Sequence, residues 1–392
     1  MKPDYVRYTK LAIVLILIIG AIVYLELQKS PPSKIIESTS NNQNAMINSK
    51  DDIKIENNKS MENNEIPQER IRNPAKEGLY EFAPDFSGIY NWINSEPLKM
   101  VDLQGKVVLI DFWTYSCVNC KRTLPYINAW YDKYHDEGLV IVGVHTPEFL
   151  FEYKTENVKT AIEKYDIKYP VAQDNDRGTW NAYNNRYWPR KYLIDKDGYI
   201  RYDHIGEGGY NETEMEIQKL LSETGAKVDE ELVNITEETP TTRNTPELYV
   251  GYDYALRRNQ NIGNEEGLQP DKEIKYNLPE NLEYDKIYVE GTWKSNSDNL
   301  EAMSDGAIVI NYVSKSVNIV ATSKESSIMK VLVDNDFLNQ SSQGDDVKIV
   351  DGESVVSIDE PRLYNIYNGE YDRKTLRLEV EKGFSFNAFT FG

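Results

Sequence analysis

The chain has 392 residues, a formal net charge of −20 and a pI of about 4.7. This length predicts two folded domains with connecting segments rather than one domain. The acidic balance argues against binding to nucleic-acid phosphates or anionic lipid as a main task, so we expect no nucleic-acid partner.

The N-terminal segment, residues 1–27, predicts a membrane anchor. Lys2, Arg7 and Lys10 precede an apolar run from Leu11 to Leu25, which with its flanks can cross a bilayer as a helix. The basic residues favour the cytoplasmic side, so we expect a single-pass protein of the cell membrane with extracytoplasmic folded domains. A cleaved signal peptide is the alternative, and it gives the folded part the same location.

The rest of the chain divides by composition. Residues 28–76 are rich in Asn, Ser, Lys and Glu and predict a disordered linker. Residues 77–225 alternate apolar strands with amphipathic helices, which predicts an α/β domain with a mixed sheet flanked by helices. A polar linker over 226–244 follows. Residues 245–392 contain short strands separated by turn residues and predict an all-β sandwich.

The predicted α/β domain has a definite order of elements. A buried strand over 107–113 precedes a helix that Gly138 ends, and a second buried strand covers 139–144. Further elements are a helix around Val158 and Ile162, a short strand over 171–173, a short helix near Trp180, a hairpin over 191–204 and a closing helix over 214–222.

The two cysteines of the chain stand together as Cys117-Val118-Asn119-Cys120, directly after the first buried strand. The first turn of a helix has unsatisfied N–H groups and the positive end of the helix dipole, and both stabilise a thiolate. We therefore expect Cys117 to attack a substrate disulfide and Cys120 to resolve the mixed disulfide. The redox-active disulfide Cys117–Cys120 would need no further cofactor.

Asp111 lies in the otherwise apolar strand, six residues before Cys117. A carboxylate is costly to bury, so its pKa should be raised, which suits it to accept the proton of Cys120 during exchange. An Asp that only caps a neighbouring backbone group is the structural alternative.

These residues resemble a known active site. Asp111-Phe112-Trp113, the cysteine pair and Pro125 resemble the active-site segment of thioredoxin, and Tyr187-Trp188-Pro189-Arg190 matches the place of that family's cis-proline. The resemblance implies that Pro189 is cis, faces the cysteine pair and shapes the substrate groove. We expect Trp113 and Trp188 to wall the site.

The resemblance extends to the extracytoplasmic part of the DipZ proteins, relatives of the TlpA and ResA reductases. It is carried by residues 113–117, by 143–148 and by Trp188-Pro189. Residues 245–392 similarly resemble the jelly-roll, carbohydrate-binding-module-like sandwich that ends DipZ chains. The resemblance implies reduction of disulfides in envelope proteins, as in cytochrome c biogenesis. Because this chain has one hydrophobic segment at most, the electrons would come from a separate CcdA-like membrane donor.

The chain departs from the ResA pattern after the cysteine pair. Thr123 stands where ResA-type proteins have an acid three residues after the second cysteine. Glu148 is a candidate substitute, although a solvated loop carboxylate is the favoured interpretation. Val118 and Asn119 leave the direction of electron flow open, and the substrate, an apocytochrome, a sulfoxide reductase or another protein, is equally open.

Other functions of a close cysteine pair are less consistent with the sequence than thiol–disulfide exchange. A structural disulfide across so short a ring would stabilise little, and a zinc site would need two further ligands, so we expect no metal. Thr114 and Cys117 give the Thr-x-x-Cys spacing of a peroxiredoxin-type thiol peroxidase, but Ile110 stands where that family has proline.

The remaining alternative is an envelope binding protein, in which the sandwich recognises a glycan or protein and the thioredoxin-like domain is a spacer. Four aromatic residues of the sandwich could stack on sugars, although aromatic residues in a sandwich are more often core. They are Trp293, Tyr312, Tyr364 and Tyr367.

Overall fold

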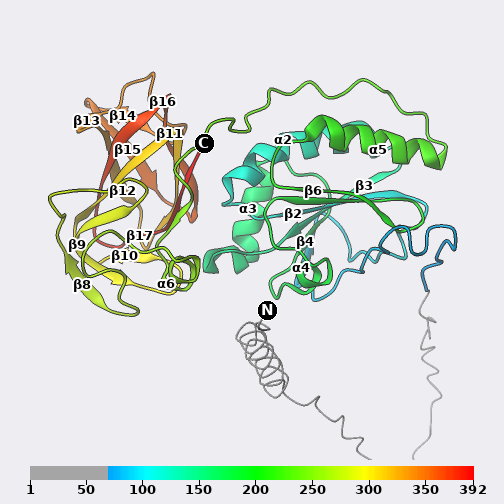
Figure 1. Ribbon diagram of the computed structural model, residues 1–392, viewed down its shortest axis with the longest axis horizontal. Helices are drawn as coiled ribbons and strands as arrows, with labels where there is room; N and C mark the ends of the chain where they lie inside the picture. The colour runs from blue at the N-terminus through cyan, green and yellow to red at the C-terminus, as the bar shows by residue number, and fades with distance from the viewer. Residues whose placement is uncertain (1–68) are drawn as a thin grey trace, which may run out of the picture. The chain divides into compact units, whose positions relative to one another are not determined.

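The computed structural model describes residues 69–392, coloured in Figure 1. The predicted anchor (1–27) and most of the predicted linker (28–76) lie outside the described residues. Within residues 69–392, no helix combines the length and the apolar character that crossing a bilayer requires. We refer below to the α/β domain (69–225) and the β domain (245–392).

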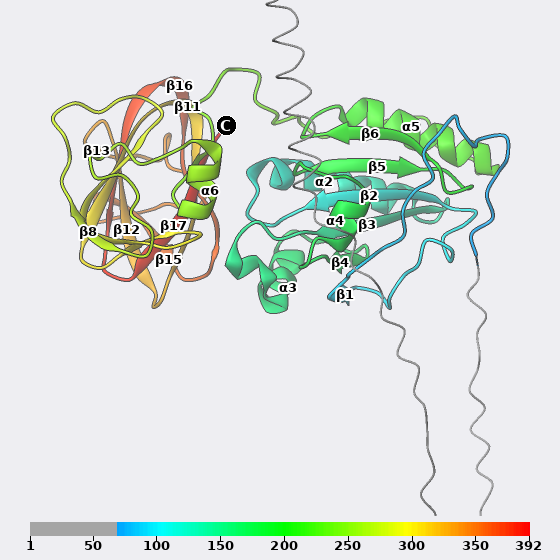
Figure 2. The ribbon, with the colours of Figure 1, turned by 60° about the horizontal axis from the view of Figure 1, so that its bottom comes forward.

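The α/β domain is built on a six-stranded mixed sheet in the order β1-β4-β3-β2-β5-β6, which Figure 2 shows across the sheet. Strands β2, β3 and β4 are parallel to one another, and β1, β5 and β6 run antiparallel to their neighbours. The strands are β1 (Asn91–Ile93), β2 (Val107–Trp113), β3 (Leu139–His145), β4 (Val171–Gln173), β5 (Arg190–Ile194) and β6 (Ile200–Ile205). The predicted order is confirmed, and β1 is an edge strand that the sequence did not indicate.

Helices cover both faces of this sheet. Helices α2, α3 and α5 pack on one face, and α4 packs on the other together with the segment before β2. Their bounds are α2 (Val118–Tyr134), the 3-10 turn η1 (Leu150–Tyr153), α3 (Thr155–Lys164), α4 (Gly178–Ala182) and α5 (Tyr210–Thr224).

All seven residues of β2 are buried, because β2 is a central strand with helices on both sides. Side chains alternate between the faces of a strand. Leu109 and Trp113 belong to the core beneath α2, whereas Ile110 and Phe112 belong to the core on the α4 side. Asp111 shares the face of Leu109 and Trp113 and is therefore directed toward the helix that carries the cysteines.

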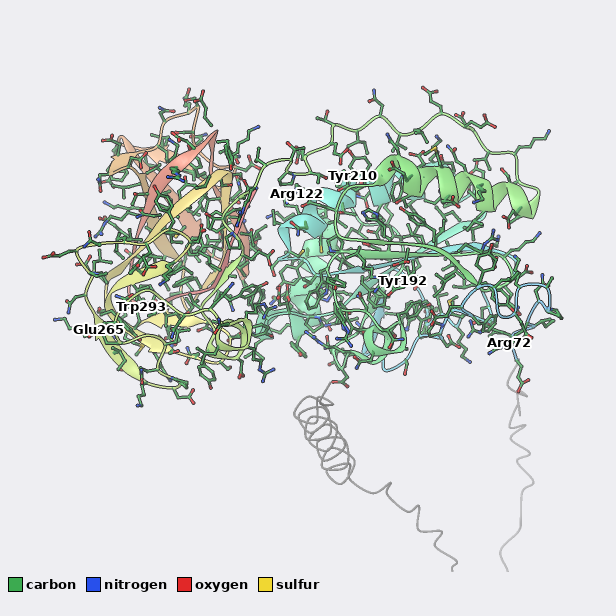
Figure 3. The ribbon with its side chains drawn as sticks, viewed as in Figure 1. Arg72, Arg122, Tyr192, Tyr210, Glu265 and Trp293 are labelled. Carbon is green, nitrogen blue, oxygen red and sulfur yellow. The ribbon has the colours of Figure 1, made fainter. Side chains whose placement is uncertain are left out.

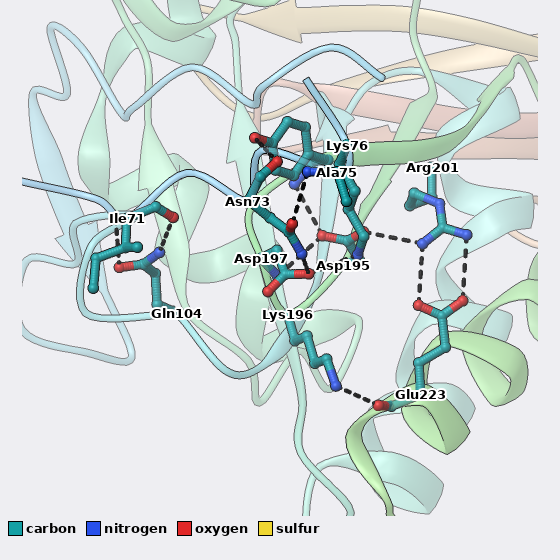
Figure 4. A network of polar contacts seen from close by, with 11 residues as sticks. Ile71, Asn73, Ala75, Lys76, Gln104, Asp195, Lys196, Asp197, Arg201 and Glu223 are labelled. Atoms are coloured by element: carbon teal, nitrogen blue, oxygen red, sulfur yellow. Dashed lines mark hydrogen bonds and ion pairs between the residues drawn. The ribbon is translucent and has the colours of Figure 1, made fainter. Parts of the chain in front are cut away.

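The described residues before 77 are bound to the α/β domain rather than free of it. Figure 4 shows the ammonium of Lys76 bridging Asp195 and Asp197, with both nitrogen–oxygen distances 2.7 Å. The guanidinium of Arg201 joins Asp195 to Glu223 of α5. This network ties the entering chain to the β5–β6 turn and to the end of α5.

Residues 226–244, predicted as a linker, contain no helix or strand but pack against the α/β domain. We call this segment the strap. Val233 and Ile235 contact the core beneath α2 and α5. The buried carboxylate of Glu214 accepts hydrogen bonds from the Tyr134 hydroxyl (2.6 Å), the Trp130 indole N–H (3.1 Å) and the Val233 N–H. The strap is therefore ordered although its composition is polar. A few apolar contacts and the buried Glu214 carboxylate hold it on the α/β domain.

The β domain consists of eleven strands, and its predicted all-β architecture is confirmed. Two long strands, β11 (Gly306–Ser323) and β16 (Arg362–Val380), pair along almost their whole length. The other strands are β7 (Leu248–Tyr249), β8 (Glu273–Tyr276), β9 (Ile287–Ser295), β10 (Leu300–Ala302), β12 (Ser327–Val333), β13 (Asp336–Phe337), β14 (Lys348–Val350), β15 (Glu353–Ile358) and β17 (Phe384–Phe391). A short helix α6 (Tyr252–Ala255) and the turn η2 (Leu256–Arg258) were not predicted.

The aromatic residues weighed as sugar-binding side chains are all buried in the core of the β domain, and Figure 3 shows Trp293 among its strands. They therefore fill the sandwich and offer no stacking surface. They are Trp293, Tyr312, Tyr364 and Tyr367.

The last strand, β17, is buried along its whole length. Its aromatic residues alternate as Phe384 and Phe386, then shift phase to Phe389 and Phe391. A bulge at Asn387 causes the shift, because Ala388 pairs with Val320 while Phe386 pairs with the next residue of β11. The four aromatic side chains fill the core, and of the other residues of β17, Ala388 and Thr390 line a cleft shared with the α/β domain.

Candidate active site

The cysteine pair lies where β2 gives way to α2. Cys117 is the N-cap residue of α2, and its sulfur accepts the N–H of Cys120 at 3.3 Å. Cys117 is half-buried, whereas Cys120 is 1% exposed, and both thiols are free. The structure thus presents one sulfur to solvent and holds the second behind it, as the sequence predicted.

A buried acid, Asp111, and a buried base, Lys191, lie behind the cysteine pair. Asp111 is 1% exposed, and burial raises its pKa to about 6, although the nearby ammonium of Lys191 opposes the rise. Lys191 pairs with Asp111 in register between β2 and β5, and burial lowers the pKa of Lys191. Burial also raises the pKa of the Cys120 thiol well above its usual value, and Cys117 raises it further. Cys120 therefore needs a base to become a nucleophile, and one Asp111 oxygen has no hydrogen-bond partner.

The loop before β5 lies opposite the thiol. The Trp188–Pro189 peptide bond is cis, as the thioredoxin resemblance implied. The indole N–H of Trp188 donates to the Thr146 carbonyl at 3.1 Å, and its ring lines a cleft together with Cys117. Trp113 differs from the prediction. It is 0% exposed and packs edge-on against His145 in the core, so it supports the site from below and does not line the cleft.

Glu152 is a positioning residue that the sequence did not reveal. Its buried carboxylate accepts the Ser116 hydroxyl at 2.6 Å and the N–H groups of Glu148 and Phe149 at 2.6 and 2.9 Å. Ser116 directly precedes Cys117. The apolar neighbours of Glu152, Phe149 and Phe151, were the available signal that this stretch packs inward. Glu152 therefore fixes the backbone on both sides of the cleft floor.

Glu148, expected to be a solvated loop carboxylate, is buried instead. It is 8% exposed and lines the cleft with Cys117. Tyr249 of the β domain donates its hydroxyl to Glu148 at 3.0 Å, and Arg258 pairs with the same oxygen at 3.3 Å. Burial, and after it the nearby Glu247, raise the pKa of Glu148 to about 8. The favoured interpretation was wrong because the partner that covers this loop comes from the other domain.

The cleft itself has a volume of about 190 Å³ and is lined by both domains. The α/β domain contributes Cys117, Glu148 and Trp188, whereas the β domain contributes Tyr249 and Thr390 among others. At its edge, the Leu150 N–H donates to Asp298 of the β domain at 3.2 Å. Within residues 69–392, no group of three or more His, Cys, Asp or Glu side chains is placed to hold a metal ion.

Comparison of this chain with known proteins shows the family to which it belongs. Residues 80–203 match the AhpC/TSA family, and residues 245–392 match a family described as a thioredoxin-like C-terminal domain. The thiol-disulfide oxidoreductase YkuV of Bacillus subtilis is 33% identical over 146 residues, which cover 37% of this chain and 98% of that protein. The chain belongs to the thioredoxin-like thiol-disulfide oxidoreductases.

Two further relatives place the chain more closely. ResA of Bacillus cereus is 33% identical over 139 residues, which cover 35% of this chain and 76% of ResA. DipZ of Mycobacterium bovis is 40% identical over 247 residues, which cover 61% of this chain and 34% of DipZ. The chain therefore spans about a third of the length of DipZ, and the predicted resemblance to the DipZ and ResA type is confirmed.

In this oxidoreductase, we expect Glu152→Gln to impair the site without touching a sulfur atom. The amide would direct N–H groups at donors that Glu152 now satisfies, so the Ser116–Cys117 backbone would lose its anchor. We expect kcat/KM for a small disulfide to fall about tenfold and the free energy of unfolding to fall by about 2 kcal/mol. Steady-state kinetics and urea unfolding measure both. Glu156→Gln, an exposed change on α3, is the matched control, and equal effects in the two variants would contradict the anchoring role.

Proposed function

We propose that this chain is a membrane-anchored, extracytoplasmic reductase that transfers two electrons from the Cys117–Cys120 pair to disulfides of envelope proteins. One observation carries the proposal: a half-buried thiol at a helix N-terminus stands over a buried thiol, with a buried carboxyl of raised pKa on the facing strand. Such a pair needs no further cofactor for exchange. The basic and apolar N-terminal sequence supports the location.

The pairing of Arg122 with Glu207 supports reduction over oxidation. A dithiol is a strong oxidant when its reduced thiolate is strongly stabilised, and a reductant when it is not. Arg122, one turn into α2, interacts electrostatically with Cys117, and Figure 3 shows Arg122 close to Tyr210 of α5. Its guanidinium donates twice to Glu207, at 2.6 and 2.8 Å. Glu207 therefore offsets part of the positive charge that Arg122 presents to the sulfur.

Turnover as a reductase requires a supply of electrons from the cytoplasmic side. We assign that supply to a separate CcdA-like membrane protein. Its reduced thiol would attack the Cys117–Cys120 disulfide, and the released dithiol would then reduce the envelope substrate. Apocytochrome c and other envelope proteins with exposed disulfides are the substrate class.

The reduction potential of the complete chain tests this direction. We expect a value in the thioredoxin range, about −270 mV, after equilibration with a thiol–disulfide buffer. A value near that of strong oxidants, about −120 mV, would reverse the electron flow. Labelling of Cys117 in intact cells by a membrane-impermeant maleimide tests the location. Absence of labelling, with labelling after lysis, would contradict an extracytoplasmic site, and peroxide consumption by the reduced protein would favour a thiol peroxidase.

A further inference from the structure

Two adjoining hollows follow the seam between the α/β domain and the β domain. The first, about 190 Å³, contains Cys117, and the second, about 560 Å³, leads away from it. Four residues line both hollows, so together they form one groove that begins at the thiol. The shared residues are Glu148, Arg186, Trp188 and Arg258.

Four arginine side chains line this groove, in a chain whose net charge is −20. Arg177 and Arg186 come from the α/β domain, and Arg257 and Arg258 come from the β domain. The guanidinium carbon of Arg177 lies 5.3 Å from the centre of the Trp188 ring, and the same group donates to the Pro147 carbonyl at 3.0 Å. Among residues 69–392, neither Arg177 nor Arg186 forms an ion pair within 4.0 Å.

Four acidic side chains also line the groove, and within residues 69–392 none of them pairs with Arg177 or Arg186; they are Glu148, Glu247, Asp253 and Asp298. Asp253 lies 3.7 Å from Arg257 and balances that residue. Glu148 pairs with Arg258, but its pKa of about 8 leaves most of it protonated at neutral pH. Burial likewise raises the pKa of Asp298, whose carboxylate accepts the N–H of Leu150. Arg177 and Arg186 therefore hold positive charge in the groove that no carboxylate of residues 69–392 pairs within 4.0 Å.

We propose that this groove binds an extended, acidic polypeptide segment that carries the disulfide to be reduced, with Arg177 and Arg186 selecting its carboxylates. The inference rests on the proposed function and adds a substrate class to it. The cleft at Cys117 is smaller than the 300–1,000 Å³ typical of drug-sized ligands, and it is walled on both sides, so an extended chain fits where a folded surface does not. The second hollow provides room for the residues that flank the cysteine.

The chemistry of the bound segment is a balanced exchange. The Cys117 thiolate attacks the segment's sulfur, the substrate S–S bond breaks, and the second substrate sulfur leaves as a thiolate. Cys120 then gives its proton to a base and attacks the Cys117 sulfur, which releases the segment as a thiolate. The enzyme loses two electrons and becomes the Cys117–Cys120 disulfide, and the substrate gains two electrons and, with two protons, becomes two thiols.

Chromogenic mixed disulfides test the charge preference with the complete chain. We would prepare a heptapeptide with a central cysteine flanked by four Glu residues, its isostere with four Gln residues, and free cysteine, each as a mixed disulfide with thionitrobenzoate. Release of the coloured thiolate by the reduced protein gives a second-order rate constant. At low salt we expect the Glu peptide to react about tenfold faster than the Gln peptide, with the ratio falling as salt screens the groove.

Arginine variants locate the preference. In the double variant Arg177→Gln/Arg186→Gln, the ratio of the rate constants for the Glu and Gln peptides should fall to near one. In Arg186→Gln alone, the same ratio should fall part of the way; this change affects an exposed side chain and should leave the fold intact. Arg373→Gln, an exposed change on β16, should keep the full ratio. A wild-type ratio near one would overturn the inference, as would free cysteine reacting faster than both peptides, which would indicate a low-molecular-weight substrate. Release from none of the three probes would contradict the proposed reductase as well.

Discussion

Replacing Cys117 with Ser should reduce the rate of disulfide reduction at least about a thousandfold, while Cys120→Ser should instead trap the substrate. Without the Cys117 sulfur no thiolate is exposed, because Cys120 is 1% exposed behind it. Without Cys120 the first attack proceeds, but the mixed disulfide at Cys117 has no resolving thiol. Mass spectrometry and non-reducing gels after incubation with an oxidised substrate measure the two outcomes.

The two cysteine variants control for one another, because each retains one thiol in the same fold. We expect a covalent adduct in Cys120→Ser and none in Cys117→Ser. Adducts of equal yield in both variants would show that the order of attack is not set by exposure. Trapping in cells with Cys120→Ser would additionally identify the envelope substrates by their bound peptides.

Asp111→Asn should slow the second step of the exchange about a hundredfold while leaving the first step close to wild type. The buried Cys120 thiol must lose its proton to attack the Cys117 sulfur, and Asp111 is the carboxyl that faces α2 from β2. Its pKa is raised to about 6, so the accepting carboxylate is present above that pH and lost below it. In the wild type, the rate of the second step should therefore rise as pH increases through about 6, and this rise should disappear in Asp111→Asn.

Stopped-flow kinetics separates the steps, because the leaving thiolate reports the first attack and release of the substrate thiol reports the second. Asp102→Asn, an exposed change just before β2, is the matched control and should retain the wild-type pH profile. Should Asp111→Asn slow both steps equally, Asp111 would act on the fold rather than as a base. A second step that remains pH-dependent near 6 in that variant would assign the base to another group.

The cysteine pair, its helix and the cis proline could be predicted from the sequence because their signals are local. A buried strand, two cysteines three apart and a Trp-Pro step each occupy a few residues, and the alternation along β2 places Asp111 on the cysteine side. The same locality explains the correct order of strands and helices in the α/β domain. The prediction for Trp113 was wrong because a sequence motif places a residue next to the cysteine pair but does not show whether its side chain lines the cleft or is buried in the core.

The second wall of the cleft could not be predicted in this way. Tyr249 and Arg258 follow Glu148 by 101 and 110 residues, and their contacts depend on how two domains dock. Nothing in the spacing of those residues marks them as neighbours of the thiol. The prediction that Glu148 is a solvated loop carboxylate was wrong for the same reason. Its loop would be exposed in the α/β domain alone, but the β domain covers it. The strap was missed because its apolar contacts come from four scattered side chains in a polar stretch.

The strap also keeps the two walls of the cleft close to each other. Because it is bound to the α/β domain as far as Ile235, only the short stretch from there to β7 remains to span the domains. A tether of that length keeps the two walls at an effective local concentration on the order of millimolar. Contact between the two walls is therefore intramolecular, and dilution of the protein does not weaken it.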